Sequence, residues 1–178
     1  NYFMPSHLIS GSLYLLGQKI DEALRSKRAI YAAYPTICVG NFQAGGTGKT
    51  PATIWVAKQL KSLGYSPIIL IRGYKGSVKN STIVDRNDAY TYGDETILHA
   101  QHFPTIVGKN RVESAQLALT ITGDKKVLVM DDGLQHYELL KDFSIVCQKS
   151  RRFELDHMLP MGLLRQIQHT NIDAILSQ

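Results

Sequence analysis

A glycine-rich loop between a strand pattern and a helix pattern constrains the fold of this chain more than any other feature. The apolar run TICVGN covers residues 36–41, the loop FQAGGTGKT follows, and apolar residues at helical spacing begin where the loop ends. A strand, a glycine-rich turn and a helix N-terminus in this order surround an anion with backbone N–H groups, and phosphate is the anion that such loops commonly hold. The sequence therefore predicts a phosphate-binding loop.

The loop departs from the pattern G-x-x-x-x-G-K-[ST] at its first position, where Gln43 replaces the glycine. The glycines that follow still supply a permissive backbone. Lys49 would bring positive charge to the β- and γ-phosphates, and Thr50 would offer a hydroxyl to Mg²⁺. A glycine turn with a chance lysine is the alternative. We expect binding of ATP with Mg²⁺, and the predicted nucleotide-binding residues are Gly45, Gly46, Thr47, Gly48, Lys49 and Thr50.

Strand and helix patterns alternate after Pro35, which predicts an α/β fold of the P-loop NTPase type, with a mostly parallel sheet flanked by helices. In such sheets ligands gather at the carboxyl ends of the strands. The polar segment 73–92 is expected to be a long surface excursion. Helices are expected at 48–63, where Val56, Leu60 and Leu63 share a face, and at 93–102 and 111–120. Strands are expected at 36–41, 66–72, 103–108, 125–131, 143–148 and 173–177.

Two acids, Asp131 and Asp132, end the strand pattern KVLVMDD. A phosphate-binding loop needs a carboxylate for the accompanying metal, and in P-loop enzymes it sits at the end of such a strand. An ordinary strand terminus would also carry acids, but the apolar run before them favours metal ligands. Gln135 and His136 follow directly. Either they form hydrogen bonds near the γ-phosphate or they belong to a solvated loop.

A third acidic cluster, GDE, places Asp94 and Glu95 at the start of a predicted helix, where carboxylates are often only partners of the helix dipole. Basic residues follow strand patterns at Arg72, Lys109 and Arg111. Since they would lie at the same sheet edge as the loop, we predict that they bind an anionic acceptor, although Arg72 could also end a common turn.

The remaining histidines and cysteines are assigned structural positions. His99 and His102 are expected on the surface of the helix at 93–102. Cys38 and Cys147 each lie inside an apolar run, so both are expected to be reduced core residues of a cytosolic protein, with no metal or disulfide role.

The first part of the chain has a different character, because residues 6–28 combine helical apolar spacing with basic residues towards the end. This amphipathic helix would either pack on its own domain or contact an anionic membrane surface. No apolar run reaches the roughly 18 residues of a spanning helix, and no signal peptide is visible, so the protein is expected in the cytoplasm. We expect this helix within residues 1–34 and a P-loop kinase domain at 35–178.

The net charge of +5 and pI near 9.2 favour an anionic partner. The chain has no recognisable nucleic-acid-binding module, so nucleic acid is not the expected partner.

These motifs together resemble the tetraacyldisaccharide 4'-kinases, the lipid A precursor kinases. The resemblance rests on VGNFQAGGTGKTP, RGYKG, GDE, DDGLQH and the LP.G.LR pattern within MLPMGLLRQ, in that order along the chain. In this family a glycine precedes the asparagine before the loop, as Gly40 precedes Asn41 here, so the absence of glycine at position 43 is a family trait. The resemblance implies transfer of the γ-phosphate of ATP to the 4'-hydroxyl of a tetraacylated glucosamine disaccharide 1-phosphate, an anionic glycolipid.

The resemblance also implies roles for individual residues. Lys49 matches the P-loop lysine, and Thr50 the Mg²⁺ ligand. Asp94 matches the proposed catalytic base, and Gln135 and His136 match active-site positions. The acids that match metal-associated positions are Glu95, Asp131 and Asp132. The basic first helix then resembles a membrane-associating segment, which implies peripheral contact with the cytoplasmic face of the inner membrane.

Departures from the family limit these expectations. Asn110 and Gln166 stand where an aspartate and an acid are usual. Both ends of the chain are expected to be cut from something longer, and the family's second domain, with the histidine partner of the Asp94-type base, is expected beyond Gln178. The 178-residue chain alone is therefore expected to be a weak or inactive kinase. The alternatives are a non-catalytic nucleotide- or lipid-binding relative and a partitioning-type switching ATPase, whose signature lysine would replace Ala44.

Overall fold

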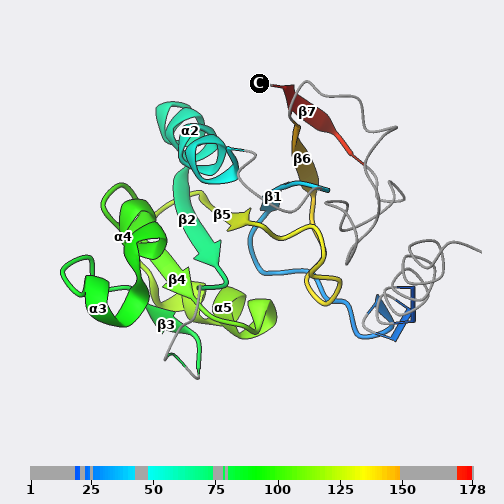
Figure 1. The fold of residues 1–178 in the computed structure, drawn as a ribbon, viewed down its shortest axis with the longest axis horizontal. Coiled ribbons are helices and arrows are strands. Elements are labelled where there is room, and N and C mark those ends of the chain that lie inside the picture. The colour runs from blue at the N-terminus through cyan, green and yellow to red at the C-terminus, as the bar shows by residue number, and fades with distance from the viewer. Residues whose placement is uncertain are drawn as a thin grey trace, which may run out of the picture.

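The computed structural model describes residues 19–20, 23–24, 26–42, 48–73, 78, 80–148 and 172–177. These residues form a seven-stranded sheet with the order β3-β4-β2-β5-β1-β6-β7 (Figure 1). All pairings are parallel except that of β3 with β4. The predicted α/β fold with a mostly parallel sheet is therefore confirmed. The strands are β1 (Thr36–Gly40), β2 (Ser66–Ile71), β3 (Thr82–Ile83), β4 (Thr105–Val107), β5 (Lys126–Asp131), β6 (Phe143–Gln148) and β7 (Ala174–Ser177).

Two apolar cores form because neighbouring residues of a strand point to opposite faces of the sheet. Cys38 packs in the same core as Ala115 of α5, whereas Val39 packs in the core that contains Ala57 of α2. Strands buried on both faces explain the continuous apolar runs in the sequence. The helices are α2 (Lys49–Ser62), α3 (Ala89–Tyr92), α4 (Asp94–Ala100) and α5 (Arg111–Leu117), and the 3₁₀ turn η1 (Ala118–Thr120) continues α5.

The structure corrects two expectations about local elements. The segment 73–92, expected to be a surface excursion, contributes β3, which pairs with β4 at one edge of the sheet, and α3. The strand β3 has only two residues and one partner strand, so it is too short to be detected from hydrophobic periodicity. Leu63 was expected on the apolar face of its helix, but it caps the end of α2 and is 70% exposed. Cys38 and Cys147 are buried free thiols, as expected.

The basic amphipathic segment 6–28 lies largely outside the described residues. Of this segment, residues 19–20, 23–24 and 26 are helical, and Ile20 and Leu24 are exposed. The chain then joins the domain, because Ile30 pairs with Leu139 and Tyr34 packs against the core. Within the described residues, no helix has the length and apolarity needed to cross a membrane.

Candidate active site

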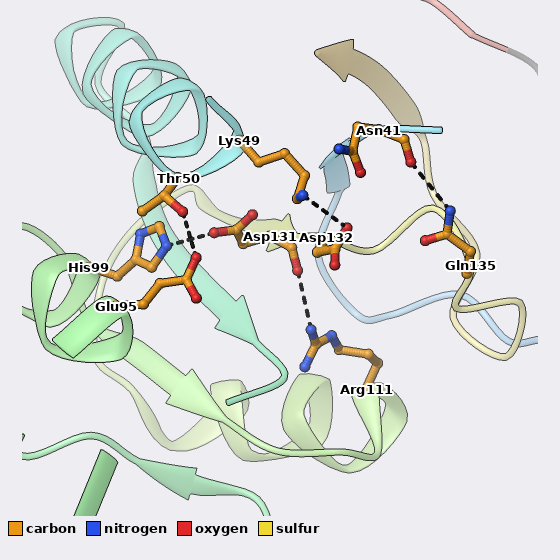
Figure 2. Close-up of polar contacts among 9 residues, drawn as sticks. All are labelled: Asn41, Lys49, Thr50, Glu95, His99, Arg111, Asp131, Asp132 and Gln135. Atoms are coloured by element: carbon orange, nitrogen blue, oxygen red, sulfur yellow. Dashed lines mark hydrogen bonds and ion pairs between the residues drawn. The ribbon is translucent and has the colours of Figure 1, made fainter. Parts of the chain in front are cut away.

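The candidate active site lies where the carboxyl ends of neighbouring parallel strands meet. Val39 near the end of β1 pairs with Asp131 at the end of β5, and Ile71 of β2 pairs with Val107 of β4. The segments that follow these strands carry most of the predicted site residues. Figure 2 shows the polar contacts among nine residues of this region.

The helix that follows the glycine-rich loop begins at a left-handed residue. Gly48 is the N-cap of α2 with φ 71°, a conformation that glycine adopts at no steric cost. Lys49 follows, and its Nζ lies 3.7 Å from Oδ1 of Asp132 (Figure 2). The predicted nucleotide-binding residues Gly45, Gly46 and Thr47, together with Gln43 and Ala44, lie outside the described residues.

The two acids at the end of β5 occupy different environments. Asp131 is buried, whereas Asp132 is half-buried. Asp132 has φ 54°, which few non-glycine residues adopt. Its N–H donates to the carbonyl oxygen of Val39 at 2.9 Å. The chain therefore turns sharply after Asp131, and this turn directs Asp132 towards the lysine of the loop.

The first turn of α4 reaches the first turn of α2. Gly93, with φ 79°, is the N-cap of α4, and Asp94 and Glu95 follow it. The Oγ1 hydroxyl of Thr50 donates to Oε1 of Glu95 at 2.6 Å (Figure 2). Asp94 is exposed, and its side chain makes no hydrogen bond to another described residue. The predicted base therefore lies next to a residue in direct contact with the helix that follows the glycine-rich loop.

The position of His99 corrects the sequence analysis, which expected this residue on the helix surface. It is fully buried, and its Nε2 lies 2.7 Å from Oδ2 of Asp131 (Figure 2). His102 is exposed, as expected. His99 stands four residues after Glu95 and therefore on the same helix face, but Glu95 is exposed, so this spacing did not reveal that His99 is buried.

The loop after β5 packs against the end of β1. Leu134 is fully buried and contacts Gly40 so closely that a Cβ at position 40 would collide with its Cγ. The Nε2 amide of Gln135 donates to the carbonyl oxygen of Asn41 at 3.3 Å (Figure 2). Sequence reasoning did not assign a role to Lys141, whose Nζ donates to the carbonyl oxygen of His136 at 2.6 Å. The contact with Asn41 places Gln135 directly before the glycine-rich loop.

His136 has an electrostatic environment that favours its neutral form. Burial and then, in decreasing order, the positive charges of Arg111, Arg72 and Lys141 lower its pKa to about 3, while Asp132 opposes them. At neutral pH the imidazole is therefore uncharged. It can donate one hydrogen bond and accept one, but it does not supply a positive charge.

Arg111, which was predicted to bind an anionic acceptor, lies inside the protein. Its guanidinium donates to the carbonyl oxygen of Gly108 from Nη1 at 2.7 Å and to that of Asp131 from Nη2 at 3.2 Å. Burial lowers its pKa to about 10, so it remains charged at neutral pH. The side chain ties the end of β4 to the end of β5 (Figure 2). Arg72 and Lys109, by contrast, are exposed.

Asn110 has a structural role that its family counterpart could share. Its Oδ1 accepts hydrogen bonds from the N–H groups of Val112 and Glu113 and so caps α5. Asparagine and aspartate are about equally good N-caps, so Asn110 preserves the start of α5. The other departure, Gln166, lies outside the described residues.

The oxygen-bearing side chains of this edge suit a hard cation. In the described part of the chain, no three His, Cys, Asp or Glu side chains form a group that could hold a metal ion by themselves. Mg²⁺ commonly needs only one or two carboxylates, because phosphate oxygens and water complete its shell. Oδ1 of Asp131 is buried and has no hydrogen-bond partner among the described residues. These observations fit Mg²⁺, and the candidate ligands are Thr50, Glu95, Asp131 and Asp132.

Comparisons with known proteins point to one family. The sequence profile of tetraacyldisaccharide-1-P 4'-kinase matches residues 8–178. Curated proteins named tetraacyldisaccharide 4'-kinase are 43% identical over 137 residues in Nitrosococcus oceani, 40% over 150 in Rhodopseudomonas palustris strain BisA53 and 35% over 165 in Rhizobium meliloti. These matches cover 74%, 81% and 88% of this chain, but 40%, 44% and 46% of the relatives. The chain thus spans less than half the length of these curated relatives.

A solved structure agrees with the sequence matches. The "apo" form of LpxK from Aquifex aeolicus in complex with ATP is similar to this chain with a TM-score of 0.84 and 30% sequence identity. The similarity covers 97% of this chain and 57% of that one.

Proposed function

Since the chain belongs to the tetraacyldisaccharide-1-P 4'-kinase family, we propose that the full-length protein transfers the γ-phosphate of ATP to the 4'-hydroxyl of a tetraacylated glucosamine disaccharide 1-phosphate. The observation that carries this proposal is the hydrogen bond between Thr50 and Glu95. It joins the helix that begins at the glycine-rich loop to the helix that carries Asp94. A nucleotide phosphate and an acceptor hydroxyl could then meet between these two helix N-termini.

The site residues would act mainly by position and charge, because phosphoryl transfer needs little covalent chemistry from the protein. Lys49 would neutralise charge that develops on the phosphates, with Gly45, Gly46, Thr47 and Gly48 providing N–H groups for them. Asp94 would orient the 4'-hydroxyl and accept its proton as the oxygen bonds to phosphorus and ADP leaves. Gln135 and the neutral His136 would offer hydrogen bonds close to the γ-phosphate.

Mg²⁺, when bound with ATP, would supply charge neutralisation across the β- and γ-phosphates. The side chains that would hold it are Thr50, Glu95, Asp131 and Asp132. Arg72 and Lys109, both exposed after parallel strands, would meet the anionic headgroup of the acceptor. Arg111 would support this edge from inside rather than touch the acceptor.

The acceptor is a lipid, so the proposal includes contact with a membrane. Residues 1–34, with their basic and apolar residues, would associate peripherally with the cytoplasmic face of the inner membrane, and residues 35–178 would form the kinase domain. The exposed Ile20 and Leu24, four residues apart, support this proposal, since an apolar pair on one helix face suits an interface.

A Lys49→Ala substitution in the full-length protein tests the proposed function. We expect transfer from labelled ATP to the disaccharide acceptor to fall on the order of 10²-fold or more, as for loss of other preorganised electrostatic groups. Lys58→Ala is a matched control, because Lys58 is exposed on the same helix. Activity within a few-fold of wild type for Lys49→Ala would reject the assigned role. A wild-type protein that binds ATP but phosphorylates no acceptor would instead support a non-catalytic relative.

A further inference from the structure

We propose that His99 is a positioning residue that orients the carboxylate of Asp131 for the cation that accompanies the nucleotide. This inference rests on the proposed function, since it deepens the assignment of the same site. His99 would not touch substrate. It would act through Asp131 and would connect α4 to β5.

The contact between the two side chains is short and shielded from water. The side chains of His99 and Asp131 are 0% and 3% exposed, and Nε2 lies 2.7 Å from Oδ2. An ionised carboxylate only accepts hydrogen bonds, so the imidazole donates from Nε2. A hydrogen bond to a charged acceptor in a buried site is strong and directional. His99 therefore holds Asp131 in one orientation.

Only one of the two oxygens of the Asp131 carboxylate accepts a hydrogen bond from a described residue. Oδ2 accepts from His99, while Oδ1 is buried and has no hydrogen-bond partner among the described residues. A buried unpaired carboxylate oxygen is costly, and here it lies at the carboxyl end of β5. The cost is relieved if Oδ1 faces a cation or a water bound to one. Carboxylates that bind metals are commonly held in place by hydrogen bonds of this kind.

The spacing on α4 makes the contact part of a larger arrangement. Glu95 and His99 are four residues apart and lie on the same helix face. Glu95 accepts from Thr50 of α2, and His99 donates to Asp131 of β5. A single short helix therefore holds one side chain against the nucleotide-binding helix and one against the strand with the metal-ligand candidates. Movement of α4 would disturb both contacts, and also Asp94 at its first residue.

If the contact between His99 and Asp131 served only to stabilise the fold, the results of substitution would differ. Removing the histidine would then lower stability but leave the cation requirement of nucleotide binding unchanged. If His99 positions Asp131, replacing the histidine should instead weaken ATP binding in the presence of Mg²⁺ and leave ATP binding without the cation unchanged. It also predicts a fall in kcat at nearly constant KM for the acceptor, because the acceptor does not contact His99.

The test uses the full-length protein with three substitutions at this position. His99→Gln keeps an amide donor near the place of Nε2, whereas His99→Asn is too short to reach Oδ2 and His99→Leu has no donor. His102→Gln is the matched control, since His102 is an exposed histidine close to the end of the same helix. Calorimetric titration with ATP, in the presence and absence of Mg²⁺, measures how ATP binding depends on the cation. Mn²⁺ serves as a spectroscopic probe of cation binding in a second experiment. Neither measurement needs the acceptor.

We expect His99→Leu and His99→Asn to lose roughly 10- to 100-fold in cation affinity, the usual range for residues that orient metal ligands. His99→Gln should recover most of the loss, and cation-free ATP binding should stay within about twofold. The proposal is overturned if a folded Leu or Asn variant keeps wild-type cation affinity, or if neither variant folds, since the role is then structural. If the variants lose cation affinity as expected but the wild-type protein phosphorylates no disaccharide, the proposed function is rejected and this inference stands.

Discussion

At the scale of single residues, the candidate site is built from polar groups whose environments differ sharply over a few positions. Asp131 is buried against a histidine, while its neighbour Asp132 turns outwards with φ 54° to meet Lys49. Positive φ at a non-glycine residue costs free energy and is often found at functional sites. The turn separates two adjacent acids into two roles, one internal and one beside the glycine-rich loop.

The depressed pKa of His136 predicts a dependence of stability on pH. The unfolded histidine takes up a proton near pH 6.5, but the folded one does so only near pH 3. Its contribution to stability is therefore fully present above about pH 6.5 and is lost as the pH falls from 6.5 towards 3. Burial of the imidazole is the main cause of the lowered pKa, and the cations Arg111, Arg72 and Lys141 add to it, opposed by Asp132.

Replacing His136 with glutamine should therefore flatten this part of the pH profile. Between pH 7.5 and pH 5, we expect wild type to lose about 1–2 kcal/mol more unfolding free energy than His136→Gln. Urea unfolding at a series of pH values measures the difference, and other titrating groups cancel because they are common to both proteins. His102→Gln, at an exposed position, should follow wild type. Parallel profiles for wild type and His136→Gln would contradict the assigned environment.

At the scale of elements, the site depends on how two loops pack at the ends of β1 and β5. Gly40 ends β1, and Leu134 of the loop after β5 occupies the space where a side chain at position 40 would lie. The same loop carries Gln135, which bonds to the carbonyl oxygen of Asn41. The glycine before the asparagine is therefore needed for close packing of two loops that both carry site residues.

Gly40→Ala should separate these loops. The added Cβ would collide with Leu134, and overpacking of this kind costs about 1–3 kcal/mol. We expect a lower unfolding free energy, measured in urea, together with weaker ATP binding. The double variant Gly40→Ala with Leu134→Ala should be more stable than the sum of the single changes predicts, because the smaller side chain makes room. Strictly additive effects would show that the contact does not limit position 40.

At the scale of the whole molecule, the described residues form one α/β unit to which the end of the first segment is attached. Ile30 pairs with Leu139, and Tyr34 packs against the core. Residues before this point carry the basic and apolar pattern for which we propose membrane contact. A deletion that ends at residue 28 would therefore remove the pattern and keep the contacts with the domain.

Deleting residues 1–28 from the full-length protein should reduce its binding to vesicles rich in anionic lipid. Apolar burial and attraction between cations and lipid headgroups act together at such a surface, but salt screens only the attraction strongly. Sedimentation with vesicles should show weaker binding of the intact protein at high salt and little binding to neutral vesicles. Binding that is unchanged by the deletion would return this segment to a structural role within its own domain.

The sequence by itself determined the features that depend on neighbouring residues in the chain. Alternating apolar runs predicted the parallel strands, and GGTGKT and DDGLQH predicted side chains that would meet at one sheet edge, while the resemblance to a family implied the site role of GDE. Lys49 does lie beside Asp132, and Thr50 does contact Glu95. The first contact follows from a simple rule, since the carboxyl ends of parallel strands must lie at the same edge, whereas only the family resemblance pointed to the second.

Only the tertiary structure decided which polar side chains are inside. His99 bonds to a carboxylate 32 positions away, and Arg111 bonds to a carbonyl 20 positions away. No local pattern distinguishes either residue from an exposed one, because a buried charge or imidazole is stable only where distant partners satisfy it. β3 escaped prediction for a related reason, since its two residues are held by β4 rather than by their own periodicity.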